Sequence, residues 1–408
     1  MTPDTRDLGS LRSAEAAQGM PGYWPFSKQD ITWSFDSGLP DPATFPVGDL
    51  TRLSAEVLRD DAAAALQYGT GHDGGIMYGY EGLRHVLAER TNAREGTRVD
   101  ERGVMLTSGG IQGISLACRA FLDPGDVVAV EAPTWGAVLI AGRQLGAEVI
   151  AIPMDSEGLR LDMLEDELRV LDSAGKRLKL LYTIATFNTP TGISLSAARR
   201  ERLVELAEQW GFLVMEDNVY GELRYEGSRL PTVLSLDDTG LVFSIDSFSK
   251  ILAPGLRLGW VTGHPDVVAA LSSVRGDLGM SQWLARVMER YVLEGLLDPH
   301  VAAVNELYRS KRDAAAAALE AHCFPWVRWA MPEGGFFLWL EIDSAIDGAG
   351  VMERALAEGV ACRPGERFFG DKDEGRQFCR LAFSMVPVDE IERGIAVLGK
   401  AISASKRT

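Results

Sequence analysis

Short apolar segments alternate with amphipathic helical segments through the middle of the chain, and this alternation limits the fold more than any other feature. The β-type segments are Val104–Thr107, Asp126–Val130, Glu148–Ile152, Leu178–Ile184, Phe212–Met215 and Val242–Ile245. Helical patterns lie between them, as at Gln112–Leu122 and at Ser196–Trp210, which Ser196 and Gly211 are suited to begin and end. The alternation predicts an α/β fold with a mainly parallel sheet, helices on both faces, and sites at the carboxyl ends of the strands.

The length of the chain and a change of pattern near Gly295 indicate two domains. A chain of 408 residues exceeds the usual size of one domain. The segments beyond Gly295 are typical of a smaller α+β unit, with helices near 298–322, 348–358 and 388–403 and strands at Gly334–Leu340 and Cys379–Phe383. We expect an N-terminal arm (1–47) that joins the small domain, a large domain (48–295) and a small C-terminal domain (296–408). Tyr23, Trp24 and Phe26 favour packing of the arm over a disordered tail.

Composition excludes several classes of protein. The net charge of −17, with no basic cluster, disfavours a nucleic-acid partner. No apolar run approaches the roughly 18 residues of a membrane span, and residues 1–10 carry no secretory signal. The four cysteines lack CxxC spacing, so we expect reduced thiols in a cytoplasmic protein, with neither a metal site nor a disulfide framework.

The segment from Ser247 to Trp260 is the strongest chemical signal. Lys250 follows the hydroxyls of Ser247 and Ser249, precedes the turn Pro254–Gly255, and lies seven residues before Arg257. This arrangement suits a lysine that forms an imine with a phosphorylated aldehyde, because the hydroxyls and the guanidinium can hold the phosphate. An isolated lysine would indicate a surface position, but the surrounding residues favour a cofactor.

Two further segments carry residues that such a cofactor needs. In Phe212–Gly221 an apolar strand runs into acids, with Asp217 at its end and Tyr220 three residues later. Asp217 also suits a helix N-cap at a strand exit. Thr107–Gly113 is a glycine-rich turn between a strand and a helix, where backbone N–H groups bind phosphate, although such turns also occur for packing alone.

Together these segments resemble the fold-type I pyridoxal 5'-phosphate-dependent aminotransferase superfamily, class I/II, and its 2-aminoadipate/kynurenine aminotransferase-like branch. The resemblance covers about residues 31–403 and implies that 48–295 binds the cofactor. It implies transfer of the amino group of an α-amino acid to a 2-oxo acid through an imine on Lys250 and a quinonoid intermediate, with Lys250 as acid and base. It also implies a homodimer with shared active sites.

The resemblance assigns roles residue by residue. Asp217 would keep the pyridine nitrogen of the cofactor protonated, and Tyr220 would bond its phenolic oxygen, which makes both catalytic together with Lys250. Gly38 and Arg380 would bind substrate, Arg380 by clamping the α-carboxylate. The residues implied to bind the cofactor are Gly109, Gly110, Ile111, Gln112, Trp135, Thr189, Asp217, Tyr220, Ser247, Ser249, Lys250, Arg257 and, reaching the phosphate of the neighbouring subunit, Tyr68.

Four of these residues also have ordinary structural explanations. Trp135 suits a core tryptophan instead of the plate that stacks on the cofactor ring, and Tyr68 suits a half-buried helix end. Arg380 suits a solvent-facing position on an edge strand, although an arginine buried unpaired in an apolar strand is costly and favours an anionic partner. Gly38 suits a plain turn.

Two places depart from the family pattern. The family often has a polar residue where Gly110 or Ile111 stands, and this difference keeps the backbone donors but removes one hydroxyl contact to the phosphate. In Phe187–Gly192, Thr189 stands where the family has an asparagine, and Asn188, one position earlier, is expected to point elsewhere on an extended backbone. A second reaction on the same cofactor therefore stays open: elimination, replacement, carbon–carbon bond formation or oxidation in specialised metabolism. A regulator that joins such a domain to a winged-helix DNA-binding domain is disfavoured, because only about 30 residues precede the matching region.

Overall fold

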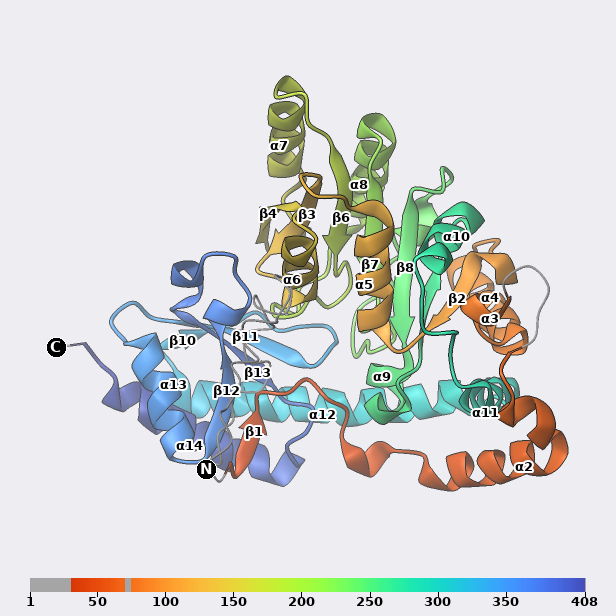
Figure 1. The fold of residues 1–408 in the computed structure, drawn as a ribbon. Coiled ribbons are helices and arrows are strands. Elements are labelled where there is room, and N and C mark those ends of the chain that lie inside the picture. The colour runs from red at the N-terminus through yellow and green to blue at the C-terminus, as the bar shows by residue number, and fades with distance from the viewer. Residues whose placement is uncertain (1–30, 70–74, 408) are drawn as a thin grey trace, which may run out of the picture.

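The computed structural model describes residues 31–69 and 75–407, which form two sheets connected by long helices (Figure 1). The aromatic residues expected to pack in the N-terminal arm, Tyr23, Trp24 and Phe26, lie outside the described residues. The larger sheet of the described chain, called here the large sheet, has eight strands. In spatial order these are β2 (Val104–Thr107), β9 (Gly259–Thr262), β8 (Val242–Ser247), β7 (Leu213–Asp217), β6 (Leu178–Thr183), β3 (Val127–Ala132), β4 (Glu148–Asp155) and β5 (Gly158–Leu159).

The centre of the large sheet is parallel, which confirms the α/β prediction. Parallel pairs join β4 to β3, β3 to β6, β6 to β7 and β7 to β8. Strand β9 pairs antiparallel with both β8 and β2 and was not predicted, because its first two residues are the last two of the Lys250 segment. Strand β5 is a second antiparallel addition, beside β4.

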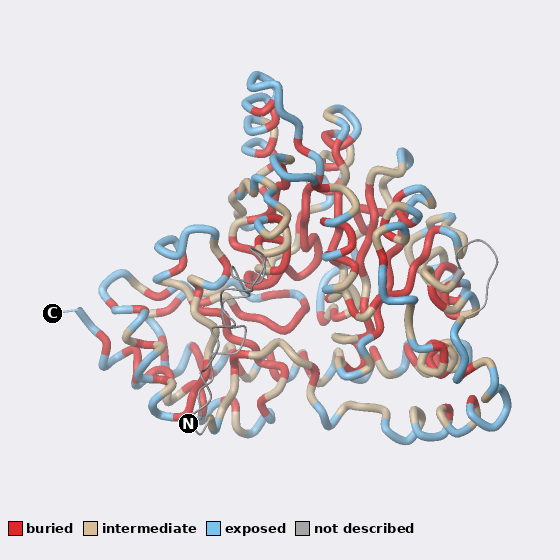
Figure 2. The backbone as a smooth tube through the Cα atoms, in the orientation of Figure 1, coloured by how far each residue is buried: buried red, intermediate tan, exposed pale blue. Residues whose placement is uncertain are grey.

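Helices cover both faces of the large sheet because successive strand residues point to opposite sides. On β3, Val128 and Val130 belong to the core that includes helix α5, whereas Val127 and Ala129 belong to a second core with α7 and α8. Figure 2 shows the buried strands between exposed helical surfaces. The helices are α2 (Val47–Leu66), α3 (Gly75–Tyr78), α4 (Glu81–Glu95), α5 (Gly110–Phe121), α6 (Gly136–Gln144), α7 (Leu161–Ser173), α8 (Ala197–Trp210), α9 (Phe248–Ile251), α10 (Pro265–Ser273), α11 (Gln282–Leu293), α12 (Leu297–Cys323), α13 (Gly348–Ala357) and α14 (Val388–Ala404).

The smaller sheet, called here the small sheet, unites the C-terminal part of the chain with residues near the N-terminus. Its strands in spatial order are β1 (Trp33–Phe35), β12 (Val360–Pro364), β13 (Phe378–Ala382), β11 (Phe337–Ile342) and β10 (Val327–Arg328). Strand β1 pairs parallel with β12, so residues 33–35 lie with the C-terminal part, as expected for the N-terminal segment. The exact domain boundaries stay a prediction. Among the described helices, none is long and apolar enough to cross a membrane.

Helix α12 runs beneath both sheets (Figure 1). The Nζ of its buried Lys311 donates to the carboxylate of Asp41 and to the carbonyl of Ser384, each at 2.6 Å. The hydroxyl of Tyr308, one turn earlier, accepts a hydrogen bond from the backbone N–H of Asp41 at 3.0 Å. The helix therefore ties the segment after β1 to the segment after β13.

Candidate active site

Lys250 lies at the carboxyl edge of the large sheet, in the short helix α9 that directly follows β8. Its Nζ donates a hydrogen bond to the carbonyl of Gly38 at 2.7 Å and lies 5.7 Å from the centroid of the Tyr220 ring. Burial and the positive charge of Arg380 lower the pKa of Lys250 to about 8, against the attraction of Asp217. An amine with this pKa is partly neutral near pH 7, and the neutral form is the nucleophile for a carbonyl carbon.

Asp217 ends strand β7 with only 5% of its surface exposed. Its Oδ2 accepts a hydrogen bond from the hydroxyl of Tyr182 at 2.7 Å, and its Oδ1 accepts one from the N–H of Val219 at 3.3 Å. Burial raises the pKa of Asp217 to about 6, while the Tyr182 bond and the charge of Lys250 favour the ionised form. In the described chain no helix begins directly after Asp217, so its alternative role as a helix cap is wrong.

Tyr182 is a site residue that the sequence did not reveal. It lies on β6, opposite Met215 of β7, and is fully buried. Burial and the neighbouring Asp217 raise the pKa of Tyr182 well above its usual value, so its hydroxyl stays a donor. A tyrosine within the apolar segment 178–184 was the available signal, but only the pairing of β6 with β7 identifies its partner.

The turn before α5 and the segment after Lys250 meet around a possible anion site. Gly109 has a φ of 73°, and a Cβ there would lie 2.5 Å from the Nη2 of Arg257, so the position requires glycine. The Nη2 of Arg257 donates to the carbonyl of Ser108 at 2.8 Å. Gly110 begins α5, and the N–H groups of its first turn point toward this place.

Two hydroxyls complete this donor set. Ser247 caps α9 through the N–H of Ser249 at 3.1 Å, and the Oγ atoms of the two serines are 2.9 Å apart. Hydroxyls, a guanidinium and a helix N-terminus are the donors that suit a phosphate group. The side chain of Ile111 is exposed, so this residue offers only its backbone N–H group. The side chain of Gln112 bonds Ser108 and Asp277, and its N–H donates to the carbonyl of Gly109 at 3.2 Å.

Arg380 is buried in the interior strand β13, so the alternative of a solvent-facing arginine on an edge strand is wrong. Its Nη1 donates to the hydroxyl oxygen of Thr189 at 3.0 Å, and its Nη2 donates to the carbonyl of Asp36 at 2.6 Å. Its guanidinium carbon lies 4.2 Å from the ring centroid of Phe337 and 5.0 Å from that of Phe368. A buried, fixed guanidinium of this kind is suited to bind a carboxylate.

Of the remaining predicted residues, Gly38 and Trp135 lie next to residues of this centre, and Tyr68 does not contact it within the described part of this chain. A Cβ on Gly38 would lie 2.3 Å from the Phe337 ring, so this glycine permits a close approach that a plain turn does not require. Trp135 is partly buried immediately before α6, and the N–H of Thr134 bonds the carbonyl of Phe368 at 2.9 Å. Tyr68 follows α2 and is 69% exposed, so the helix-end alternative as a half-buried residue is wrong.

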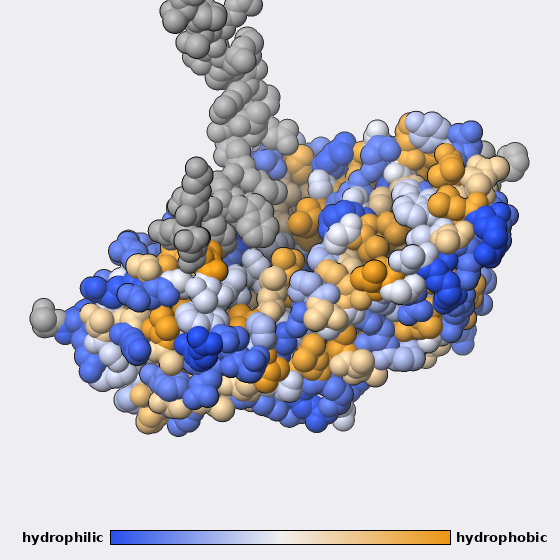
Figure 3. Space-filling model, turned by 90° about the horizontal axis from the view of Figure 1, so that it is seen from below, coloured by the Kyte–Doolittle hydropathy of each residue, from blue (hydrophilic) through white to orange (hydrophobic). Residues whose placement is uncertain are grey.

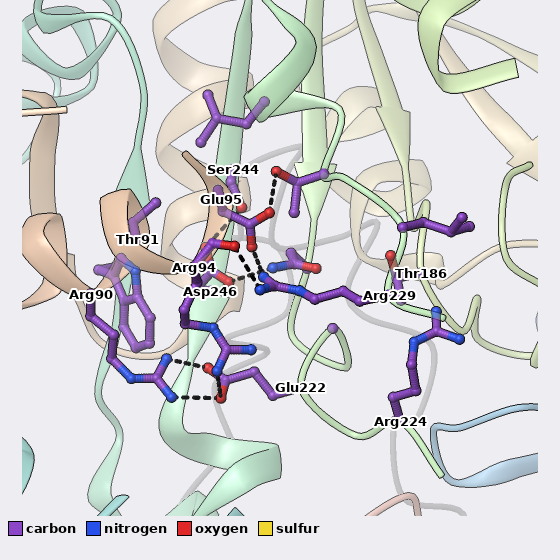
Figure 4. A pocket seen from close by; sticks show the side chains of 16 residues that line it. Arg90, Thr91, Arg94, Glu95, Thr186, Glu222, Arg224, Arg229, Ser244 and Asp246 are labelled. Atoms are coloured by element: carbon purple, nitrogen blue, oxygen red, sulfur yellow. Dashed lines mark hydrogen bonds and ion pairs between the residues drawn. The ribbon is translucent and has the colours of Figure 1, made fainter. Parts of the chain in front are cut away.

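A small polar pocket of about 40 Å³ lies between α4 and residues 218–222, the segment that follows Asp217 (Figure 4). Glu222 pairs with Arg90 at 2.6 Å and with Arg94 at 3.2 Å. The carboxylate of Asp246 accepts hydrogen bonds from Ser244 at 2.7 Å and from Asn218 at 2.9 Å. Because Asn218 and Glu222 flank the turn that carries Tyr220, these contacts hold the turn after Asp217 in place.

Comparisons with known proteins find relatives that match most of the chain. The family model for aminotransferase class I and II matches residues 44–398. Aromatic-amino-acid aminotransferase 1 of Thermococcus litoralis is 40% identical over 371 residues, which cover 90% of this chain and 87% of that protein. The crystal structure of Pyrococcus horikoshii kynurenine aminotransferase, in complex with PMP, has a TM-score of 0.90 and 36% identity over 98% of each chain. The α-aminoadipate aminotransferase LysN of Thermus thermophilus, complexed with N-(5'-phosphopyridoxyl)-L-leucine, has a TM-score of 0.83 and 30% identity over 97% of this chain and 96% of that chain.

Proposed function

Because this chain belongs to the class I and II aminotransferases and is a pyridoxal-phosphate-dependent aminotransferase, we propose that it transfers the amino group of an aromatic α-amino acid to a 2-oxo acid. The comparisons favour transamination over the alternative reactions on the same cofactor. The observation that supports the residue assignment is that one segment contacts both key groups: the amine of Lys250 donates to the carbonyl of Gly38 at 2.7 Å, and the guanidinium of Arg380 donates to the carbonyl of Asp36 at 2.6 Å.

Each group has a distinct task in this proposal. Pyridoxal phosphate, when bound, supplies the electron sink for the negative charge that develops at the substrate α-carbon. Lys250 takes the proton from that carbon, because its lowered pKa lets its amine act as a base near neutral pH. Asp217, ionised above about pH 6, holds a positive charge on the ring nitrogen. Arg380 binds the α-carboxylate and so orients the α-carbon toward Lys250.

The phosphate is proposed to lie in the donor set formed by Ser247, Ser249, Arg257 and the first turn of α5. Tyr220 is proposed to bond the phenolic oxygen, since its buried ring lies near the Lys250 amine. Trp135 is proposed as the plate against the cofactor ring.

The proposed aromatic substrate class rests on the rings beside Arg380. Phe337 and Phe368 contact the guanidinium, and the partly exposed Trp339 lies 5.7 Å from Phe368, centroid to centroid. Aromatic walls next to a carboxylate clamp suit a large planar side chain. Two relatives, an aromatic-amino-acid aminotransferase and a kynurenine aminotransferase, support the same class.

A homodimer is part of the proposal. Leu66, Tyr68 and Val47, at the two ends of α2, are 72%, 69% and 66% exposed, and Leu293 at the end of α11 is 63% exposed. Figure 3, which looks at the molecule from below, shows several apolar patches among the charged residues. Exposed apolar residues of this kind are typical of an interface, and Tyr68 is proposed to reach the phosphate site of the partner. A cytoplasmic location stays a prediction.

A spectral titration of the purified protein with pyridoxal phosphate tests the function. Borohydride is expected to fix the cofactor on Lys250, as peptide mass analysis would show. Phenylalanine, tyrosine, tryptophan and kynurenine are expected to convert the bound cofactor to its amine form, and 2-oxo acids are expected to reverse the change. Failure of every amino acid to do so would refute transamination, whereas conversion only by alanine, aspartate or 2-aminoadipate would refute the aromatic substrate class.

A further inference from the structure

Glu131 is a buried carboxylate at the site that the proposed chemistry does not use. It lies near the end of β3 with 1% of its surface exposed. It accepts three hydrogen bonds, from the hydroxyl of Thr183 at 2.6 Å, the N–H of Ile184 at 3.0 Å and the Nδ2 of Asn188 at 2.7 Å. In the described part of the chain no lysine, arginine or histidine forms an ion pair with it. Burial of an ionised acid without a cation is costly, so the three hydrogen bonds must offset that cost.

Asn188 connects Glu131 to the loop that contains Thr189 and Thr191. A carboxylate only accepts hydrogen bonds, so the amide nitrogen of Asn188 faces Glu131 and its oxygen faces the other way. That oxygen accepts hydrogen bonds from the hydroxyl of Thr191 at 3.0 Å and from the N–H of Thr191 at 3.3 Å. The side chain is fully buried, and both of its ends are engaged. Asn188 thus fixes the backbone on either side of Thr189.

Thr189 is the contact between this loop and the carboxylate clamp. Its hydroxyl oxygen accepts the hydrogen bond from the Nη1 of Arg380, and the residue is 4% exposed. The side chain of Asn188 binds Glu131, as expected from its position one residue before Thr189, but the backbone around it bends and turns and is not extended. The hydroxyl at position 189 is therefore placed by the amide of its neighbour.

We propose that Glu131 is a positioning residue for the substrate carboxylate. Glu131 holds Asn188, Asn188 fixes the position of Thr189, and the hydroxyl of Thr189 orients the guanidinium of Arg380. The inference rests on the proposed function, in which Arg380 binds the α-carboxylate. Amino-acid donor and 2-oxo-acid acceptor both carry that carboxylate. Glu131 therefore acts on the binding of both substrates.

The chain offers a conservative variant and a matched control. In Glu131→Gln the amide oxygen can still accept from Ile184 and Asn188, and the new NH₂ can donate to Thr183. Glu131→Ala leaves the Asn188 amide without an acceptor, and Asn188→Ala breaks the same link from the other side. Glu216 is also a buried strand carboxylate, but its hydrogen bonds come from the N–H groups of Val233 and Leu234, and it lies 3.8 Å from the Nη1 of the buried Arg200. Glu216→Gln therefore controls for the loss of a buried carboxylate charge that has no contact with Asn188.

The experiment compares these variants as holoenzymes at pH 8. KM for donor and acceptor, kcat, the cofactor absorption spectrum and the dissociation constant of 3-phenylpropionate, a carboxylate without an amino group, are measured. Burial raises the pKa of Glu131 to about 7, so the acid is mostly ionised at pH 8. We expect E131A and N188A to raise both KM values and the dissociation constant about tenfold. N188A keeps the Glu131 carboxylate near Asp217, so its spectrum should be unchanged and its kcat should stay within about threefold of wild type.

The conservative variant separates positioning from loss of structure. E131Q is expected to keep both KM values within about threefold of wild type, and E216Q is expected to leave them unchanged. If E131A does not fold, N188A supplies the same comparison. Unchanged KM and 3-phenylpropionate binding in N188A would overturn the inference while the proposed function stands. A wild-type protein that transaminates no amino acid would instead overturn the proposed function.

Discussion

Replacement of Tyr182 with phenylalanine removes one hydroxyl from the site and tests how Asp217 is kept ionised. The Tyr182 hydroxyl donates to Asp217 at 2.7 Å, and both residues are buried. A neutral donor stabilises the charged form of a carboxylate and does nothing comparable for the protonated form. The variant should therefore raise the pKa of Asp217 further above its usual range.

The size of the effect follows from the strength of the bond. A hydrogen bond to a charged group contributes about 1.5–3 kcal/mol, and 1.36 kcal/mol corresponds to roughly one pKa unit. Loss of the bond should raise the pKa of Asp217 by about one to two units above its present value of about 6. At pH 7 most of the carboxylate would then be protonated and unable to balance a positive charge on the cofactor ring.

The pH dependence of cofactor affinity measures this shift. The dissociation constant of pyridoxal phosphate is determined from pH 5 to 9 with cofactor-free wild-type and Y182F proteins. The cofactor's own titrations are common to both proteins, so the displacement of the acid limb reports Asp217. Tyr225→Phe is the control, because the buried hydroxyl of Tyr225 donates to the Gly335 carbonyl and not to Asp217. A displacement of the Y182F limb by less than about half a unit would refute the role of this hydrogen bond.

Three further changes test other parts of the site. Gly38→Ala puts a Cβ 2.3 Å from the Phe337 ring, so we expect thermal or urea denaturation to show a loss of about 1–3 kcal/mol and kinetics to show a kcat/KM about tenfold lower. Lys250→Met removes an amine whose pKa is lowered from 10.5 to about 8. Because the unfolded state binds more protons over that range, cofactor-free wild type should gain stability as pH rises from 8 to 10.5, and a pH series of Tm should lack this gain in the variant. Arg380→Lys loses the planar fork, so both substrate KM values should rise about tenfold with a smaller change in kcat, and unchanged KM values would exclude Arg380 as the clamp.

The sequence was sufficient to predict the residues whose neighbours along the chain indicate their chemical role. Lys250 lies within a run of hydroxyls, a turn and an arginine, and Asp217 lies at the end of an apolar strand, so both were predicted with their elements. The parallel centre of the large sheet followed from the alternation of apolar strands and helices. These features are local, and local pattern is what a single sequence reports.

The residues that were missed depend on contacts between distant strands. Tyr182 meets Asp217 only because β6 and β7 pair in one register, and Glu131 meets Asn188 across 57 residues of chain. In the sequence each is one polar residue in an apolar run. The direction of Arg380 was equally hidden, since the position of β13 inside the small sheet decides that it is buried.

Helix α12 helps to set the distance between the amine of Lys250 and the guanidinium of Arg380. Lys250 follows a strand of the large sheet, and Arg380 lies in the small sheet. The distance between the two side chains therefore depends on how the two sheets are positioned relative to each other. A misplacement of about 1 Å can cost an enzyme on the order of a hundredfold in rate. Lys311 fixes α12 to the segments after β1 and β13 of the small sheet, and Asn305 of the same helix donates to the carbonyl of Glu222, after β7 of the large sheet, at 2.9 Å. Helix α12 therefore acts as an alignment element between the two sheets, although it carries none of the proposed catalytic groups.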